Sequence, residues 1–161
     1  MPHRKRGIEF VRNLIKGKIA EIVFQHMFAE AEFCTVIPFG YETIVPQLAQ
    51  YQHLLDDNDA LTNIRNAPDF ILIKPDNTSI VLVDVKYRHK RNPQRVKDIA
   101  LSMAKRWDTA WLFLATPDGF YFGPCQDIIE DAGEIKPLLD QWVKKDVQAA
   151  YLSLLREFEP S

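Results

Sequence analysis

The sequence is poor in the residues that build thiol frameworks and zinc sites. Among 161 residues there are two cysteines, Cys34 and Cys125, and they form no CxxC or Cys/His cluster of zinc-site spacing. The four histidines show no HxH or HExxH spacing either. We therefore expect two plain core thiols, and we expect neither a disulfide nor a structural zinc ion.

Long apolar segments are also missing. No run of about 18 apolar residues occurs, and the basic N-terminus, MPHRKRGIEF, is not followed by an apolar signal-peptide core. We expect no membrane partner and a cytoplasmic protein. With only six glycines there is no Gly-rich phosphate-binding loop, and no Ser/His/Asp set suggests a hydrolase triad.

Positive charge does not dominate the total but is concentrated in two stretches. The net charge is -2, yet residues 1–18 contain six Lys or Arg against one acid, and residues 86–106 contain eight against one. Acidic residues dominate after residue 118. A neutral total can therefore contain a basic, phosphate-binding face. The alternative is that the segment KYRHKR is an ordinary solvated loop.

Apolar residues recur at helical spacing from Gly7 to about Glu32, which predicts one long helix. Two apolar stripes run along it, so we expect it to be covered on two sides. Glu21 falls within the second stripe and should point toward neighbouring structure. His26 falls on the first stripe, and we expect it to be packed rather than to be a ligand.

The rest of the chain predicts a single α/β domain over residues 1–161, with a mixed sheet flanked by helices. Residues 46–66 indicate a helical excursion or a long loop. Strands are expected at 34–38, 70–74, 80–86, 111–116 and 120–122, and helices at 96–107 and 135–158.

Charged residues interrupt the end of the most apolar strand, IVLVDVK. A turn centred on residues 76 and 77 would pair residues whose numbers sum to about 153 and would set Asp69 opposite Asp84. The strand period of two places Lys86 on the same face as Asp84, with Val85 on the other. Opposed carboxylates need a shared cation or proton, and their oxygen atoms suit a magnesium-type ion.

Lys86 beside such an ion could orient or deprotonate a water molecule, or stabilise a negative transition state. The simpler alternatives are that Asp69 is a turn residue, that Asp84 and Lys86 form an ordinary ion pair, and that Glu21 pairs with Lys18 on its own helix.

These residues together resemble the PD-(D/E)xK nuclease superfamily, which has the restriction-endonuclease-like fold. The resemblance consists of KGKIAEIVF around Glu21, the pair Pro68-Asp69 opening a strand, and Asp84-Val85-Lys86 closing the next. It is most similar in appearance to archaeal-type Holliday junction resolvases and related restriction-type domains. It covers about residues 7–122. The segment 43–66 is longer than a minimal resolvase needs, and the helical part at 135–158 is an elaboration.

The resemblance implies an αβββαβ core and hydrolysis of DNA phosphodiester bonds with Mg²⁺ or Mn²⁺. Asp69 and Asp84 would be metal ligands, with the Val85 carbonyl and, directly or through water, Glu21 as further ligands. Lys86 would be the catalytic lysine. The residues expected to contact nucleic acid are Tyr87, Arg88, Lys90, Arg91, Gln94 and Arg95, together with the N-terminal segment HRKR.

Two other functions stay open at this point. A catalytically inactive module of the same fold would bind nucleic acid or a protein partner without cutting, and an RNA-processing role is not separated from a DNA role. A two-fold homodimer would suit symmetric cutting of two strands, although no interface signature is present.

Overall fold

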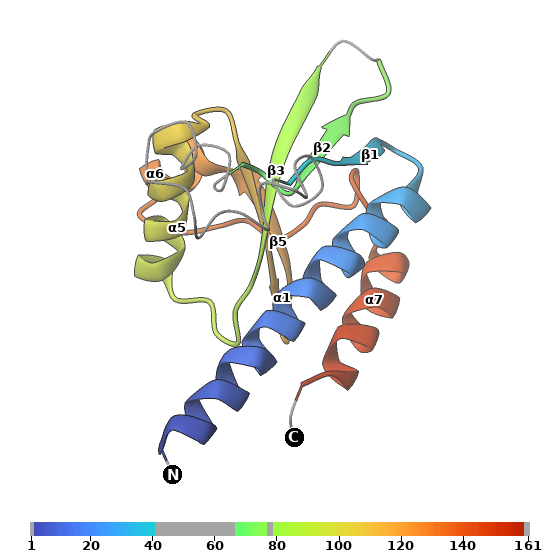
Figure 1. The fold of residues 1–161 in the computed structure, drawn as a ribbon. Helices are drawn as coiled ribbons and strands as arrows, with labels where there is room; N and C mark the ends of the chain where they lie inside the picture. The colour runs from blue at the N-terminus through green and yellow to red at the C-terminus, as the bar shows by residue number, and fades with distance from the viewer. Residues whose placement is uncertain (1, 41–66, 77–78, 160–161) are drawn as a thin grey trace.

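The computed structural model describes residues 2–40, 67–76 and 79–159. The segment 43–66, including the helical excursion or long loop expected at 46–66, lies outside these residues. The elements in chain order are α1 (Pro2–Ala31), β1 (Thr35–Pro38), β2 (Phe70–Ile73), β3 (Ile80–Tyr87), α5 (Pro93–Arg106), β4 (Trp111–Thr116), β5 (Gly119–Pro124), α6 (Cys125–Glu130) and α7 (Lys145–Glu157) (Figure 1).

The strands form one mixed sheet in the order β1-β2-β3-β4-β5. Among the strands of the described residues only the β3–β4 pair is parallel, and α5 provides the crossover that a parallel connection requires. The β2–β3 hairpin pairs Phe70 with Val83 and Ile73 with Ile80, so the register keeps the predicted sum of 153. The predicted mixed α/β sheet flanked by helices is therefore confirmed, and so is this hairpin register.

Helices cover both faces of the sheet, and each face has its own hydrophobic core. On one face α1 and α7 pack on the sheet around Phe24, Phe28 and Phe113 (Figure 1). On the other face α5 and α6 pack around Val96 and Leu112. Phe113 and Leu112 are neighbours in β4, and the strand period of two sends them to opposite faces. Cys34 and Cys125 are both buried free thiols, as expected.

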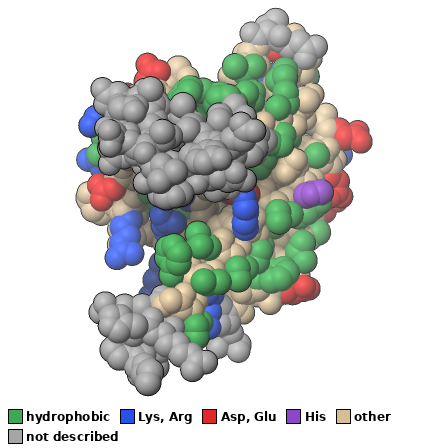
Figure 2. Space-filling model, in the orientation of Figure 1, with side chains coloured by type: hydrophobic (Ala, Val, Ile, Leu, Met, Phe, Trp, Pro, Cys, Tyr) green, Lys and Arg blue, Asp and Glu red, His purple; other side chains and the backbone are tan. Residues whose placement is uncertain are grey.

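The helix α1 buries only one arc of its C-terminal half. Buried side chains recur from Ala20 to Phe28, whereas Phe10 and Leu14 are 64% and 57% exposed. The expectation of two covered sides is wrong, because the N-terminal half extends past the sheet and one sheet covers one arc of a helix (Figure 1). The expectation of a packed His26 is wrong as well, since this side chain lies outside the buried arc and is exposed. Hydrophobic side chains are visible on the exposed surface of α1 (Figure 2).

The predicted helix at 135–158 begins only at Lys145. Residues 136–138 instead run beside β5, where the Phe122 N–H donates to the Lys136 carbonyl and the Leu138 N–H donates to the Phe120 carbonyl, each at 3.0 Å. A turn follows, in which the Trp142 N–H donates to the Leu139 carbonyl at 3.1 Å. Pro137 forms an isolated bridge with Tyr121. Proline lacks the N–H that a helix interior needs, so the segment buries its apolar residues along the sheet edge. The short helix α6 was not predicted.

None of the helices in the described residues is long and apolar enough to cross a membrane.

Gly133 is a position where substitution by a residue with a side chain should destabilise the fold. Its φ is +94°, and an added Cβ would lie 1.9 Å from the carbonyl oxygen of Pro93 at the start of α5. We expect Gly133→Ala to lower the free energy of unfolding by roughly 2–5 kcal/mol, from backbone strain and overpacking together. Urea denaturation measures this loss.

Gly123→Ala is the matched control, because an added Cβ there meets nothing within 4 Å. Equal unfolding midpoints for the two variants would contradict the tight contact between Gly133 and α5.

Candidate active site

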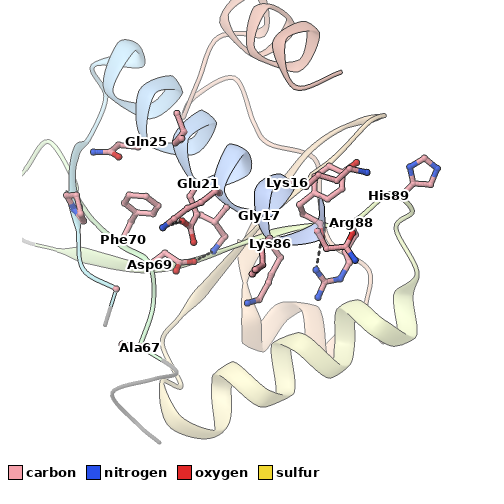
Figure 3. Close-up of a pocket in the computed structure, with 18 residues that line it drawn as sticks. Lys16, Gly17, Glu21, Gln25, Ala67, Asp69, Phe70, Lys86, Arg88 and His89 are labelled. Carbon is pink, nitrogen blue, oxygen red and sulfur yellow. Dashed lines mark hydrogen bonds and ion pairs between the residues drawn. The ribbon is translucent and has the colours of Figure 1, made fainter. Parts of the chain in front are cut away.

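A cleft of about 1290 Å³ opens between α1 and the carboxyl end of β3. It is lined by α1, by the segments that flank β1 and β2, and by the end of β3 (Figure 3). Six of the predicted site residues line it, namely Glu21, Asp69, Val85, Lys86, Tyr87 and Arg88. Asp84 is not a lining residue, because its side chain is buried in the sheet with 4% of the residue exposed.

Asp69 is held in place by both its backbone and its side chain. Its carbonyl oxygen accepts hydrogen bonds from the N–H groups of Phe39 and Gly40, at 2.9 and 3.1 Å. Its carboxylate accepts a hydrogen bond of 2.8 Å from the Val85 N–H. Since Phe70 pairs with Val83, the next position of the same register places Asp69 opposite Asp84.

The environment of Asp69 disfavours its charge. Burial, and then the negative charge of Asp84, raise the pKa of Asp69 from 3.8 to about 8, while the hydrogen bond from Val85 acts in the opposite direction. Glu21 adds a smaller rise in the same pKa. A carboxyl group with this pKa holds a proton near neutral pH unless a cation approaches it. The pair therefore favours a shared proton or a bound cation.

Lys86 forms an ion pair with Asp84 but does not satisfy the hydrogen-bonding capacity of its carboxylate. The Lys86 Nζ is 3.4 Å from the Asp84 Oδ2, and the lysine side chain is 39% exposed toward the cleft. The same carboxylate oxygen is buried and has no hydrogen-bond partner, so the contact is an ion pair by distance and lacks hydrogen-bond geometry. This leaves one carboxylate oxygen available to a further cation. The predicted common face of Asp84 and Lys86 agrees with this contact.

Glu21 takes part in two interactions. Its Oε2 is 3.2 Å from the Nζ of Lys18, which is the pairing within the helix that the sequence left open. Its charge also acts on Asp69, and Figure 3 shows Glu21 extending from α1 toward Asp69. Among the residues described, no three Asp, Glu, His or Cys side chains form a group that could hold a metal ion as they stand. The structure thus brings together two carboxylates and a lysine, with Glu21 nearby.

The other predicted nucleic-acid contacts lie outside the cleft lining. Lys90, Arg91, Gln94 and Arg95 are exposed around the start of α5. Gln94 donates a hydrogen bond of 3.1 Å to Asp98 on its own helix, so the structure does not bring it to the carboxylates in a supporting role. Lys and Arg side chains are visible on the side of the molecule where α5 lies (Figure 2).

Arg88 connects the cleft to this outer basic group. Its Nη1 donates a hydrogen bond of 2.6 Å to the Tyr87 carbonyl. Burial, and then the positive charge of Arg95, lower the pKa of Arg88, while Asp84 acts in the opposite direction. A partly desolvated guanidinium beside a second one attracts anions strongly.

Several residues near the site were missed by the sequence analysis. Lys16 and His89 line the cleft, and both approach Glu159 from the C-terminal end of the chain. Cys125 is buried close enough to Asp84 that burial, followed by that charge, raises its pKa to about 12. These neighbours are far apart in sequence, so no local motif could have indicated them.

The chain matches no known protein-family model and no curated protein.

Proposed function

We propose that the cleft is the active site of a divalent-metal-dependent nuclease with a restriction-endonuclease-like fold, which hydrolyses phosphodiester bonds in DNA. The observation that carries this proposal is the opposed pair Asp69 and Asp84 with Lys86 beside it. These residues lie at the open end of the β2–β3 hairpin, away from its turn. The order helix, three strands, helix, strand supports it, because the resemblance in the sequence implies the same order.

The two carboxylates fit a hard divalent cation. The Asp84 Oδ2 is buried without a hydrogen-bond partner, and the pKa of Asp69 is raised by burial and by Asp84. A cation between them would satisfy both groups. Mg²⁺ is commonly held by one or two carboxylates and keeps several waters, so a third acidic side chain is not required.

Asp69 and Asp84 would therefore hold Mg²⁺ or Mn²⁺, with the Val85 carbonyl and Glu21 as the further ligands. When bound, such an ion acidifies a water molecule and stabilises charge on a phosphate oxygen. The hydrogen bond from Val85 to Asp69 orients that carboxylate before any ligand arrives. The second carboxylate, that of Asp84, is restricted by burial in the sheet.

Lys86 would act on the reacting groups. Its ammonium lies at the cleft wall, with Asp84 keeping it near the carboxylates. From there it can orient the attacking water or stabilise negative charge that develops on the phosphate.

The basic residues support a nucleic-acid substrate. Tyr87 and Arg88 line the cleft, and Lys90, Arg91, Gln94 and Arg95 follow them toward α5. Such a path can bind successive phosphates along a strand. DNA is the proposed substrate, and RNA is the alternative that the assay must include.

One observation favours a second candidate, a catalytically inactive module of the same fold that binds nucleic acid or a protein partner. Glu21 is paired with Lys18, and no three-ligand group is formed among the residues described. A binding module has no need of such a group.

Cleavage of labelled substrates separates the two candidates. Linear duplex, single-stranded and four-way-junction DNA, with an RNA of the same sequence, are incubated with Mg²⁺, Mn²⁺ or EDTA. The nuclease proposal predicts DNA cleavage that requires the metal. Binding of DNA without cleavage under every condition would favour the inactive module.

A further inference from the structure

The C-terminal end of the chain reaches the cleft through one carboxylate. The Glu159 Oε2 lies 3.4 Å from the Lys16 Nζ and 3.6 Å from the His89 Nδ1. Lys16 and His89 both line the cleft, and Figure 3 shows them near Arg88. The side chains of Lys16 and Glu159 are only 13% and 12% exposed, so this contact is largely withdrawn from water.

The contact leaves hydrogen-bonding capacity unused. Charge-assisted hydrogen bonds are usually about 2.7–2.9 Å long, which is shorter than either contact of Glu159. The second oxygen, Oε1, is buried without a partner, and so is the hydroxyl group of Tyr87. The Tyr87 ring lies beside Lys16, with the Nζ 5.3 Å from the ring centroid. The hydrogen-bond donors here are the Lys16 ammonium, the Tyr87 hydroxyl and the His89 ring. An anion with more acceptor oxygens than a carboxylate could accept from more of them.

We propose that Lys16, Tyr87 and His89 form a phosphate subsite of the cleft, and that Glu159 is an internal counterion which the phosphate displaces. The chemistry recognised is a phosphate mono- or diester. That this phosphate belongs to a nucleic acid rests on the proposed nuclease function. The existence of the phosphate subsite does not depend on that function.

The position of Glu159 allows this exchange without disturbing the fold. It lies two residues beyond the end of α7, and its own N–H donates to the Arg156 carbonyl at 3.1 Å. The Arg156 Nε donates a hydrogen bond of 2.7 Å to the Pro117 carbonyl, which holds the end of α7 in place. Reorientation of the Glu159 side chain would therefore free the Lys16 ammonium, and the already exposed His89 ring, for contact with a ligand.

The test compares Glu159→Gln with Glu157→Gln. Each variant removes one negative charge from the C-terminal end, but Glu157 is an exposed residue of α7 and is not among the partners of Lys16 or His89. Binding of a labelled single-stranded DNA oligonucleotide is measured by fluorescence anisotropy in EDTA at several salt concentrations. We expect Glu159→Gln to bind about three- to tenfold more tightly, with a salt slope steeper by about one contact, and Glu157→Gln to stay within about twofold of wild type.

A second probe, inorganic pyrophosphate titrated by calorimetry, separates the subsite from the nuclease proposal. Tighter pyrophosphate binding by Glu159→Gln, with no DNA binding by any variant, would uphold the subsite and contradict the nucleic-acid assignment. Equal behaviour of the two Gln variants with both probes, or weaker binding by Glu159→Gln, would overturn the subsite.

Lys16→Met provides an independent variant should Glu159→Gln fail to fold. It removes the ammonium group and keeps an apolar stem of similar length. We expect it to weaken pyrophosphate binding at least threefold. Unchanged affinity in this variant would also overturn the proposal.

Discussion

We expect Lys86→Met to lose almost all of the proposed metal-dependent cleavage while keeping the fold intact. The side chain is partly exposed at the cleft wall, so methionine replaces its stem without creating a cavity. What disappears is the ammonium group next to Asp84. Loss of a group that positions a water or stabilises a developing charge lowers rates by about 10²- to 10⁴-fold. Initial cleavage rates at saturating Mg²⁺ measure the effect, and thermal unfolding in the same buffer monitors the fold.

Lys90→Met is the matched control for this experiment. Lys90 is exposed, lies four residues further along the chain and does not line the cleft. We expect its cleavage rate to stay within about threefold of wild type at low salt, since it would lose one phosphate contact. Cleavage by Lys86→Met at the wild-type rate would show that Lys86 has no role in the reaction.

Asp69→Asn is expected to stabilise the metal-free protein at pH 8. The pKa of Asp69 is about 8 in the folded protein, against an ordinary value of 3.8. The folded state therefore binds this proton more tightly than the unfolded state, so the contribution of Asp69 to stability is fully present below about pH 4 and is lost as the pH rises toward 8. Asparagine has no proton to lose, and its amide oxygen can still accept the hydrogen bond from Val85. We expect a gain of roughly 2–5 kcal/mol over wild type at pH 8 and little difference at pH 4.

Urea unfolding in EDTA at pH 4, 6 and 8 measures this dependence, with Asp108→Asn as a control at an exposed acid. Addition of Mg²⁺ at pH 8 should stabilise wild type more than Asp69→Asn, because a ligand that binds only the folded state raises its stability. If wild type and Asp69→Asn had the same free energy of unfolding at all three pH values, this would contradict a carboxyl group at Asp69 that burial and the charge of Asp84 destabilise in its ionised form.

The part of the site on the β2–β3 hairpin could be predicted because its determinants are local. Turn residues between two apolar runs set the register, and the strand period of two set the faces of Asp84 and Lys86. The structure has the same register, and it places Lys86 against Asp84 as the period requires.

Other features depend on contacts between distant segments. Residues 135–143 have helical apolar spacing, but the backbone groups of Lys136 and Leu138 pair with β5 and the residues after them form a turn. The apolar stripes of α1 did not show that its N-terminal half extends past the sheet. The contact between Lys16 and Glu159 joins residues 143 positions apart, which no sequence periodicity can indicate.

Calorimetric titration of Mg²⁺ into wild type and Asp84→Asn at pH 7 tests the central claim most directly. Asparagine matches the shape of the buried aspartate but removes the negative charge that the cation requires. We predict a binding heat in wild type and at least about tenfold weaker binding, or none, in Asp84→Asn. Absence of Mg²⁺ binding in wild type, or equal affinity in both proteins, would contradict a metal site at Asp69 and Asp84.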